Sequence, residues 1–243
     1  MFSLYKKEVH SYFASPFAYV LSALFLLVFS LSFIRSISTM DSNVLKFSFS
    51  EIFYNNFFFF IFMIPLLTMR TFAEERQAKT ETIWLSAPIT IPQVVLAKYF
   101  AVVTVYGLMM LLSLVFPLIA WIKGSVVFSS LICGYAGFFF WGLVCIAVGV
   151  MTSAMTDNTI LAAIFGETAM LLIIFLDTFT ETKLIQSMPA VAKVFTWFST
   201  QARFAKFSQG LFSLSDLVFF LTLSTVALVW TIIIIEKRRW SRG

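Results

Sequence analysis

Residues 52–69 of this chain read IFYNNFFFFIFMIPLLTM and carry no charge, whereas residues 70–98, RTFAEERQAKTETIWLSAPITIPQVVLAK, carry four basic and three acidic side chains. The first stretch is long enough to cross the hydrocarbon core of a bilayer as a helix, which takes about 20 apolar residues. The second stretch is too rich in charge to lie in hydrocarbon. Together they predict a membrane-spanning helix that leads into a segment at the membrane surface.

The composition extends this interpretation to the whole chain. Hydrophobic residues make up 60% of the 243 residues and charged residues 12%, against roughly 45–50% and 25% in globular proteins. A soluble fold has too little interior to bury so much apolar surface, so we predict a polytopic, all-α membrane protein. Two Cys and one His argue against a disulfide scaffold or a metalloenzyme. The net charge of +5 gives no indication of nucleic-acid binding.

Charge-poor stretches of span length recur along the chain. Backbone groups in lipid must bond within their own segment, so each stretch is predicted to be a helix. The chain is interpreted as one transmembrane domain, 1–243, in which Asp157 or Asn158 caps the fifth span. Six transmembrane helices are predicted, over residues 17–34, 52–69, 99–122, 130–154, 158–176 and 217–235.

Basic residues indicate the orientation. Ten Lys and Arg side chains flank the spans on one side and seven on the other, four of these seven within one long loop. Positive charge concentrates on the cytoplasmic side, and long loops weigh little in that rule. Both termini are therefore predicted to be cytoplasmic.

Two segments outside the spans show helical periodicity. In residues 1–15, apolar side chains recur at spacings of three and four ahead of Pro16, which indicates a helix lying in the membrane interface; an unstructured basic N-terminus is the alternative. In the outer stretch 177–215, apolar residues at helical spacing indicate short amphipathic helices at or dipping into the outer surface. A structured extracellular loop fits that pattern as well.

The charged segment is predicted to form a cytoplasmic helix over residues 71–86. Thr71 and Glu74 have the T-x-x-E spacing of a capping box, and Pro88 ends the pattern. Two interpretations stay open: a surface helix that covers the ends of its own bundle, and a docking element for a cytoplasmic partner.

Glu167 is a carboxylate in the middle of a predicted span, where ionisable groups are costly and face a protein interior or a water path. It is interpreted as a proton or cation site, as a polar contact for substrate or a second subunit, or as a hydrogen-bonded structural residue. The chain contains no Walker A motif, and its nine Gly leave little material for a phosphate cradle. We therefore expect no enzymatic activity and no cofactor bound by this chain.

At this point the residues resemble a known family, the ABC-2 type permeases. The charged segment is similar to the family loop R-x-F-A-E-E-[KR]-x-x-G-T-x-E-x-L-x-x-[SA]-P followed by G-K-[FY]. Lys79 and Ala97 stand where the family pattern has Gly, and a helical Lys at position 79 is expected to stiffen the segment. The residues that match the pattern are Arg70, Phe72, Glu74, Glu75, Arg76, Thr80, Glu81, Pro88, Lys98 and Tyr99.

Both ends of the chain carry further matches, so the resemblance spans essentially its whole length. The start LYKKEVHSYFASPFAYV is similar to K-[KR]-E-x-x-x-[YF]-F-x-[ST]-P-x-[AG]-Y. The tail FSQGLFSLSDLVFF, with Gly210 and Asp216 as its outer-loop motif, resembles the gliding-motility-associated branch.

The resemblance implies the transmembrane subunit of an ATP-binding cassette transporter, in most cases an exporter of a bacterial inner membrane. It implies six spans, an N-terminal interfacial helix, a coupling helix after the second span and re-entrant helices before the sixth. ATP and Mg²⁺ are expected on a separate ATPase subunit, and a second permease copy or paralogue and a membrane protein with a large extracytoplasmic domain are implied as further partners. The residues implied to contact the ATPase are Arg70, Glu74, Glu75, Arg76, Thr80 and Glu81.

Two rival functions remain open. A free-standing secondary carrier or ion-coupled channel would use Glu167 as its coupling group. A membrane-anchored scaffold would need neither an ATPase nor a transported substrate.

Overall fold

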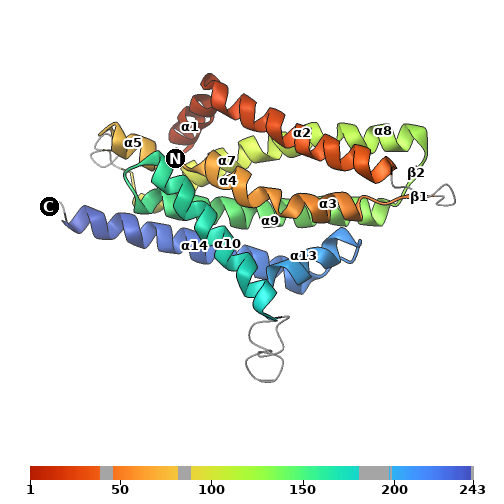
Figure 1. Ribbon diagram of the computed structural model, residues 1–243. Coiled ribbons are helices and arrows are strands. Elements are labelled where there is room, and N and C mark those ends of the chain that lie inside the picture. The colour runs from red at the N-terminus through yellow and green to blue at the C-terminus, as the bar shows by residue number, and fades with distance from the viewer. Residues whose placement is uncertain (39–45, 82–88, 181–196, 198, 242–243) are drawn as a thin grey trace.

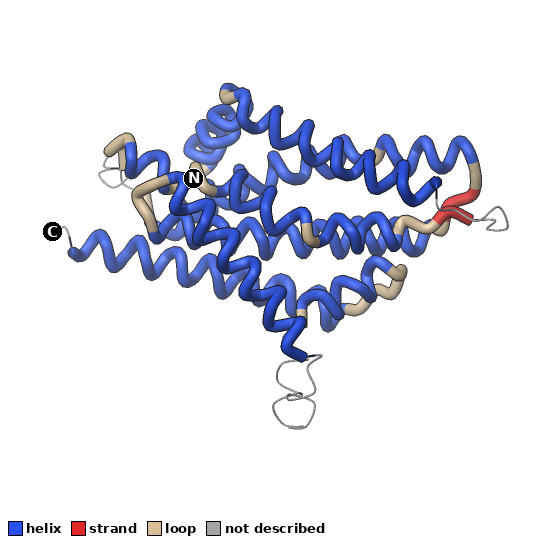
Figure 2. The backbone as a smooth tube through the Cα atoms, viewed as in Figure 1, coloured by secondary structure: helices blue, strands red, loops and turns tan. Residues whose placement is uncertain are grey.

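A computed structural model describes residues 1–38, 46–81, 89–180, 197 and 199–241. These residues are almost entirely helical, and the two short strands contain two residues each (Figure 2). The elements are α1 (Phe2–Ala14), α2 (Pro16–Ser38), β1 (Lys46–Phe47), α3 (Ser50–Phe57), α4 (Phe59–Thr68), α5 (Ala73–Gln77), α7 (Ile91–Ser113), α8 (Val115–Lys123), β2 (Ser125–Val126), α9 (Phe128–Met155), α10 (Thr159–Thr180), α13 (Thr200–Ser208) and α14 (Leu214–Ser241).

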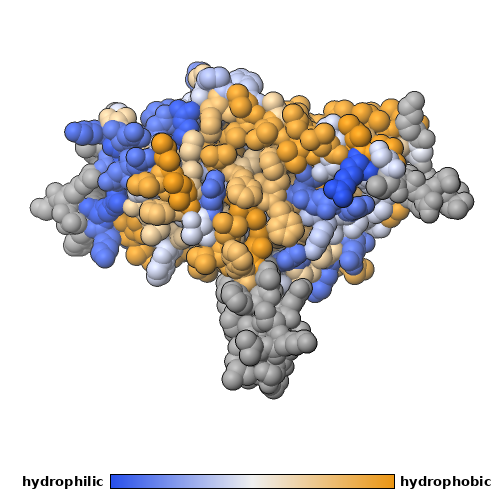
Figure 3. Space-filling view, in the orientation of Figure 1, coloured by the Kyte–Doolittle hydropathy of each residue, from blue (hydrophilic) through white to orange (hydrophobic). Residues whose placement is uncertain are grey.

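The molecule has the dimensions and surface of a membrane protein. Four helices are long and apolar enough to cross a bilayer, and the bent pair α3–α4 makes a fifth if it counts as one span. Figure 3 shows a largely hydrophobic middle flanked by hydrophilic side chains toward both ends. Membrane character is thus confirmed. The predicted count of six is not established, because the apolar part described for α10, Thr159–Phe175, is shorter than the other spans.

The polar elements gather at the two ends of the bundle. Both chain termini lie at the same end as α5, and the β1–β2 pair lies at the opposite end (Figure 1). The two strands run parallel, with Lys46 opposite Ser125 and Phe47 opposite Val126. This pair joins the loop after α2 to the turn between α8 and α9.

Helix α9 forms the centre of the bundle, in contact with α14, α10, α13, α4, α7 and α3. Two of its glycines let neighbours approach closely. A Cβ at Gly142 would collide with the ring of Tyr106, and a Cβ at Gly149 would collide with the side chain of Thr68. The absence of these two side chains therefore sets how near α7 and α4 come to the central helix.

Two of the four consecutive phenylalanines, Phe57 and Phe60, lie in the core, where aromatic rings pack edge to face and stacked, whereas Phe58 is exposed. The Phe60 and Phe138 ring centroids are 4.3 Å apart, and Phe57 stacks on Trp141 at 4.6 Å. Phe57 and Phe60 have no exposed surface. The core consequently joins the bent pair α3–α4 to α9 through aromatic contacts.

Two predicted spans differ from the observed helices. Residues 52–69, predicted as one helix, are two helices bent by 57° near Phe58. The Asn56 amide donates to the Ile52 carbonyl at 2.8 Å, and such a side-chain bond competes with the helix backbone. Proline 65 also lies inside α4. Residues 52–69 are therefore not one continuous helix, although the bent pair can still make one crossing.

The span predicted over 99–122 begins earlier and is interrupted at one residue, Leu114, without a sharp bend. Helix α7 starts at Ile91, after a capping box made by Thr90 and Gln93. It ends at Ser113 and α8 continues from Val115. Because Pro117 has no backbone N–H, the Ser113 carbonyl loses its helical donor, which explains the break.

Most other boundaries agree with the prediction to within four residues, whereas α14 runs six residues past the predicted end at Ile235. Helix α1 ends at Ala14 and α2 begins at Pro16, so the proline separates the two helices as predicted. The Asn158 side chain accepts from the backbone N–H of Ile160 at 2.8 Å, which confirms the predicted cap of α10.

Candidate docking site at the α5 end

Helix α5 is much shorter than the predicted helix over 71–86. It covers Ala73–Gln77, and Lys79 follows in the left-handed region with φ 57°. The Thr80 N–H bonds the Glu75 carbonyl and the Lys79 N–H bonds the Arg76 carbonyl, which together form a Schellman motif that ends a helix. The prediction of a helical Lys79 was therefore wrong. Residues 82–86 lie outside the described part of the chain.

The predicted capping box is also wrong. The Thr71 hydroxyl donates to the Thr68 carbonyl at 2.6 Å. The hydroxyl oxygen of Ser153, on α9, accepts from the backbone N–H groups of Phe72 and Ala73, each at 3.1 Å. A side chain about 80 residues away in sequence thus caps α5 and fixes it to the central helix.

A buried lysine joins three helices at this end. Lys98 of α7 is 1% exposed, and its Nζ lies 3.1 Å from Glu8 of α1 and 3.0 Å from Glu75 of α5. It also donates to the Thr71 carbonyl at 2.7 Å and lies over the ring of Phe72. A buried ammonium group needs this much compensation. The cluster therefore holds α1, α5 and α7 together.

Arg70, which follows α4, connects that helix to the junction between α1 and α2. Arg70 donates to both carboxylate oxygens of Glu74, at 2.7 and 2.5 Å, and to the Ser15 hydroxyl at 2.9 Å. The nearby Tyr12 hydroxyl donates to the Leu67 carbonyl at 3.3 Å. Burial raises the pKa of Tyr12, so this hydroxyl remains a hydrogen-bond donor. These bonds fix the α1–α2 junction to the end of α4.

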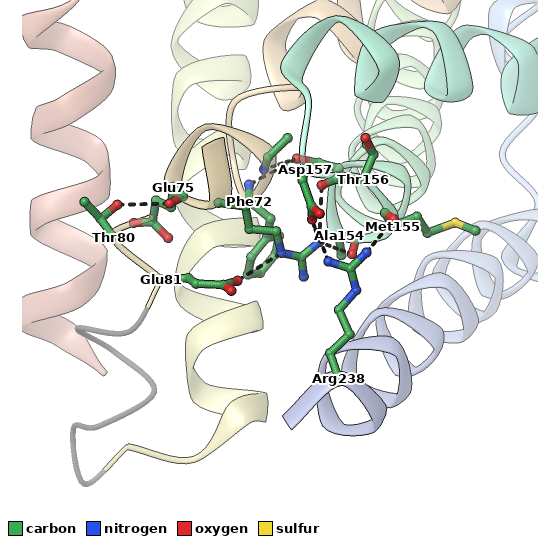
Figure 4. A network of polar contacts seen from close by, with 12 residues as sticks. Phe72, Glu75, Thr80, Glu81, Ala154, Met155, Thr156, Asp157 and Arg238 are labelled. Atoms are coloured by element: carbon green, nitrogen blue, oxygen red, sulfur yellow. Dashed lines mark hydrogen bonds and ion pairs between the residues drawn. The ribbon is translucent and has the colours of Figure 1, made fainter. Parts of the chain in front are cut away.

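Arg76 is the most deeply buried charge of α5, with 3% of its side chain exposed. Its guanidinium contacts Glu81 at 3.2 Å and donates to the carbonyls of Ala154 and Thr156 at the end of α9. Arg238 of α14 donates to Asp157 in the same turn at 2.7 Å. Figure 4 shows Glu81, Asp157 and Arg238 converging on this turn. The arrangement joins α5, the α9–α10 turn and the C-terminal helix.

A cleft of about 250 Å³ lies between α1 and α5. Its lining includes three basic and three acidic side chains, namely Lys7, Arg70, Lys98, Glu8, Glu74 and Glu75. A space lined by charged and polar side chains therefore remains between α1 and α5, although these six groups form ion pairs.

The structure divides the six predicted contact residues into three groups by their exposure. Arg76 and Glu81 are buried, and Arg70, Glu74 and Glu75 are half-buried in ion pairs within the chain. Thr80 is exposed, as are its neighbours Gln77, Ala78 and Lys79. The charges therefore position α5, and the exposed turn 77–80 is the surface it presents. Sequence reasoning missed Glu8, Ser153, Asp157 and Arg238, which complete the arrangement.

The outer-loop motif has structural roles at the opposite end. Gly210 has φ 89° and ends α13 in a second Schellman motif, through bonds from Gly210 N to Phe207 O and from Leu211 N to Lys206 O. Asp216, 1% exposed at the start of α14, pairs with Arg203 and Lys206 of α13. The first of the short outer helices predicted here falls largely on residues outside the described part.

Glu167 is half-buried on α10. Among the residues that the structure describes, its carboxylate has no hydrogen bond or ion pair. The structure brings it together with none of the charged residues at the α5 end.

No model of a protein family matches this chain, and no curated protein sequence matches it.

Proposed function

We propose that this chain is the transmembrane subunit of an ATP-driven transporter of the ABC-2 type, located in a bacterial-type inner membrane and most consistent with an exporter. One observation carries the proposal: a short surface helix, α5, is fixed by buried charges to four parts of the bundle while its C-terminal turn stays exposed. A force applied to that turn reaches α1, α7 and α9 through direct contacts of α5, and α14 indirectly through Asp157 and Arg238.

The arrangement of the bundle supports the same topology. Both termini and α5 lie at one end (Figure 1), as expected if α10 completes an even set of six crossings. The excess of basic residues makes that end cytoplasmic. The chain itself does no chemistry in this proposal, and ATP and Mg²⁺ bind a separate ATPase subunit that contacts the turn 77–80.

Two permease subunits and two ATPases make up the working unit in this proposal. ATP binding draws the ATPases together, and the connected helices switch as rigid bodies between two packings. ATP drives the switch only to the extent that it binds one of the two states more tightly.

The experiment is affinity purification of the tagged chain from native membranes in mild detergent, with ATP hydrolysis of the eluate as the readout. We expect a co-eluting ATPase that is lost from Lys79→Glu, because this exposed side chain lies on the docking turn. Lys6→Glu is the matched control, an exposed lysine on α1 away from that turn. An eluate without ATPase, or transport by the isolated chain in vesicles, would exclude the proposal.

A further inference from the structure

A groove separate from the charged cleft lies between the start of the chain and the first half of α7. Its volume is about 420 Å³, within the range of about 300–1,000 Å³ that is typical of small-molecule pockets. Figure 1 shows α1 near the α5 end of the bundle, running across the direction of α2. The residues that line this α1–α7 groove are Met1, Phe2, Tyr5, Ala97, Phe100, Val103 and Thr104.

The walls of the groove are apolar, because its two hydroxyl groups are already bonded. The Thr104 hydroxyl donates to the Phe100 carbonyl at 2.8 Å, so the Tyr5 hydroxyl donates to the Thr104 oxygen, also at 2.8 Å. The rings of Phe2 and Tyr5 stack with their centroids 6.2 Å apart. A molecule that fills the groove therefore has to be apolar where it lies between the two helices.

A cation lies at the rim of the groove. The Lys6 ammonium group is 4.8 Å from the centre of the Phe2 ring, and among the described residues Lys6 has no ion pair. Glu8 is the one acid of α1, and it is buried against Lys98. The rim therefore carries a positive charge that no acid of α1 compensates.

The apolar walls and the cation lie at different depths. Thr104 lies about 9 Å further along α7 than Lys98, since a helix rises 1.5 Å per residue. The charged groups around Lys98 belong to the polar end of the bundle, so the groove extends from that end toward the hydrophobic middle. A phospholipid has the same order, with its phosphate at the surface and its acyl chains below.

We propose that the α1–α7 groove binds an acyl chain of an anionic phospholipid, whose phosphate contacts the Lys6 ammonium group. Basic residues next to a membrane attract anionic lipids, and an interfacial helix buries its apolar face among their acyl chains. The bound chain fills the space between α1 and α7, and the phosphate supplies the negative charge that Lys6 lacks within the protein.

A surface that merely faces lipid has a different character. Helix α2 exposes Leu27 at 54% and Leu31 at 59%, with no charged residue between them. Such a flank distinguishes poorly between one lipid and another, because it contacts acyl chains alone. The groove combines an apolar cavity with a cation, so it should select a lipid by its head group.

The test is native mass spectrometry of the chain purified in mild detergent, with phosphatidylglycerol and phosphatidylcholine of identical acyl chains as competing probes. We expect the protein to retain phosphatidylglycerol in preference to phosphatidylcholine. Lys6→Gln should lower the affinity for phosphatidylglycerol about fivefold, the effect of one lysine near an anionic membrane surface.

Lys7→Gln is the matched control. It removes the same charge from the next residue, which lines the cleft between α1 and α5 and approaches Glu75 at 3.9 Å. Equal losses of affinity in the two variants would show that general attraction to anionic lipid is the cause, and would overturn the proposal. Equal retention of the two lipids by the unmodified protein would overturn it too.

A second pair of variants tests the groove itself. Val103→Trp places a large ring in the groove from a half-buried position and should abolish lipid retention, whereas Leu27→Trp on α2 should leave it unchanged. Circular dichroism establishes that both variants are folded, and if Val103→Trp does not fold, Lys6→Gln decides the question. Full retention by folded Val103→Trp, or a bound molecule whose mass is not that of a phospholipid, would refute the site.

The lipid site does not depend on the proposed transporter function. In the purification described above, Lys6→Glu should keep the ATPase, because Lys6 lies away from the turn 77–80, and should lose phosphatidylglycerol. Lipid retention without a co-eluting ATPase would refute the transporter function and leave the lipid site intact.

Discussion

Lys98 and Glu8 are 90 positions apart in the sequence, yet their charged groups lie 3.1 Å apart with the lysine almost completely buried. Glu75 of α5 shares the same ammonium group. Helices α1, α7 and α5 thus meet at one nitrogen atom. A displacement of α5 must either carry α1 and α7 along or break this contact.

Removing the Lys98 ammonium group should therefore destabilise the fold strongly. Lys98→Met leaves two carboxylates without their shared partner, and we expect a loss of about 3–5 kcal/mol of unfolding free energy. The measurement is denaturant unfolding of the purified chain in detergent, followed by circular dichroism. Lys7→Met is the control, because Lys7 is 65% exposed and 3.9 Å from Glu75, and such pairs contribute about 0–1 kcal/mol.

A triple variant distinguishes the loss of an attractive ion pair from the penalty for leaving two buried carboxylates without a partner. Adding Glu8→Gln and Glu75→Gln to Lys98→Met should recover much of the stability, because an uncompensated buried charge causes most of the penalty. If the triple variant is less stable than Lys98→Met alone, this explanation is wrong.

Lys79 and Gly210 both have a left-handed backbone conformation, and substitutions at these two positions are expected to change stability in opposite directions. Lys79→Gly should raise the unfolding free energy by about 1 kcal/mol, because a side chain is unfavourable at the C′ position of a Schellman motif. Gly210→Ala should lower it by at least ~1–2 kcal/mol, since the new Cβ would also lie 2.9 Å from the Ser130 nitrogen. Changes of the same sign in both variants would contradict the assigned backbone conformations.

We expect the small side chain of Ser153 to contribute measurably to the stability of α5. Ser153→Ala removes the acceptor for two backbone N–H groups of α5, and we expect a loss of about 1 kcal/mol together with faster amide exchange of Phe72 and Ala73. Ser22→Ala is the control, because the Ser22 hydroxyl donates to Ala18 within its own helix. Unchanged exchange at both amides would show that the cap is dispensable.

The packing of the central helix can be tested with two glycines in mid-helix positions. Gly142→Ala should cost about 1–3 kcal/mol through overpacking against Tyr106. Gly107→Ala on α7 has open space around its new Cβ and should be neutral or stabilising by up to about 1 kcal/mol. Thermal unfolding of both variants in the same detergent compares the two sites. Equal effects would show that α9 is not tightly packed there.

The ends of a helix were predictable from the sequence where the length of the apolar stretch alone determines them. Helix α9 matches its apolar stretch closely. Pro16 separates α1 from α2 because a proline suits the first turn of a helix. The break before α8 was also present in the sequence, as Pro117, but the charge-free stretch 99–122 concealed it. The length of an apolar stretch indicates that it can cross a membrane, but it does not show whether the helix is continuous.

The structure of the candidate docking site was predictable only in part. The charged segment predicted a helix after α4, but its local pattern overestimated the length of α5 because T-x-x-E and good helix formers favour a long helix. Tertiary contacts determine the actual length: the cap comes from Ser153, and the partners of Arg76 lie at the far end of α9. A pattern within one segment contains no information on contacts some 80 residues away, and Arg76 therefore looked like a surface residue.

The parallel strand pair has a mechanical consequence. By linking the loop after α2 to the turn before α9, it acts as a staple at the end remote from α5. Both ends of the bundle are thus tied, by backbone hydrogen bonds at β1 and β2 and by buried ion pairs at α5. We expect relative motion of α2 and α9 to be smallest beside the two strands.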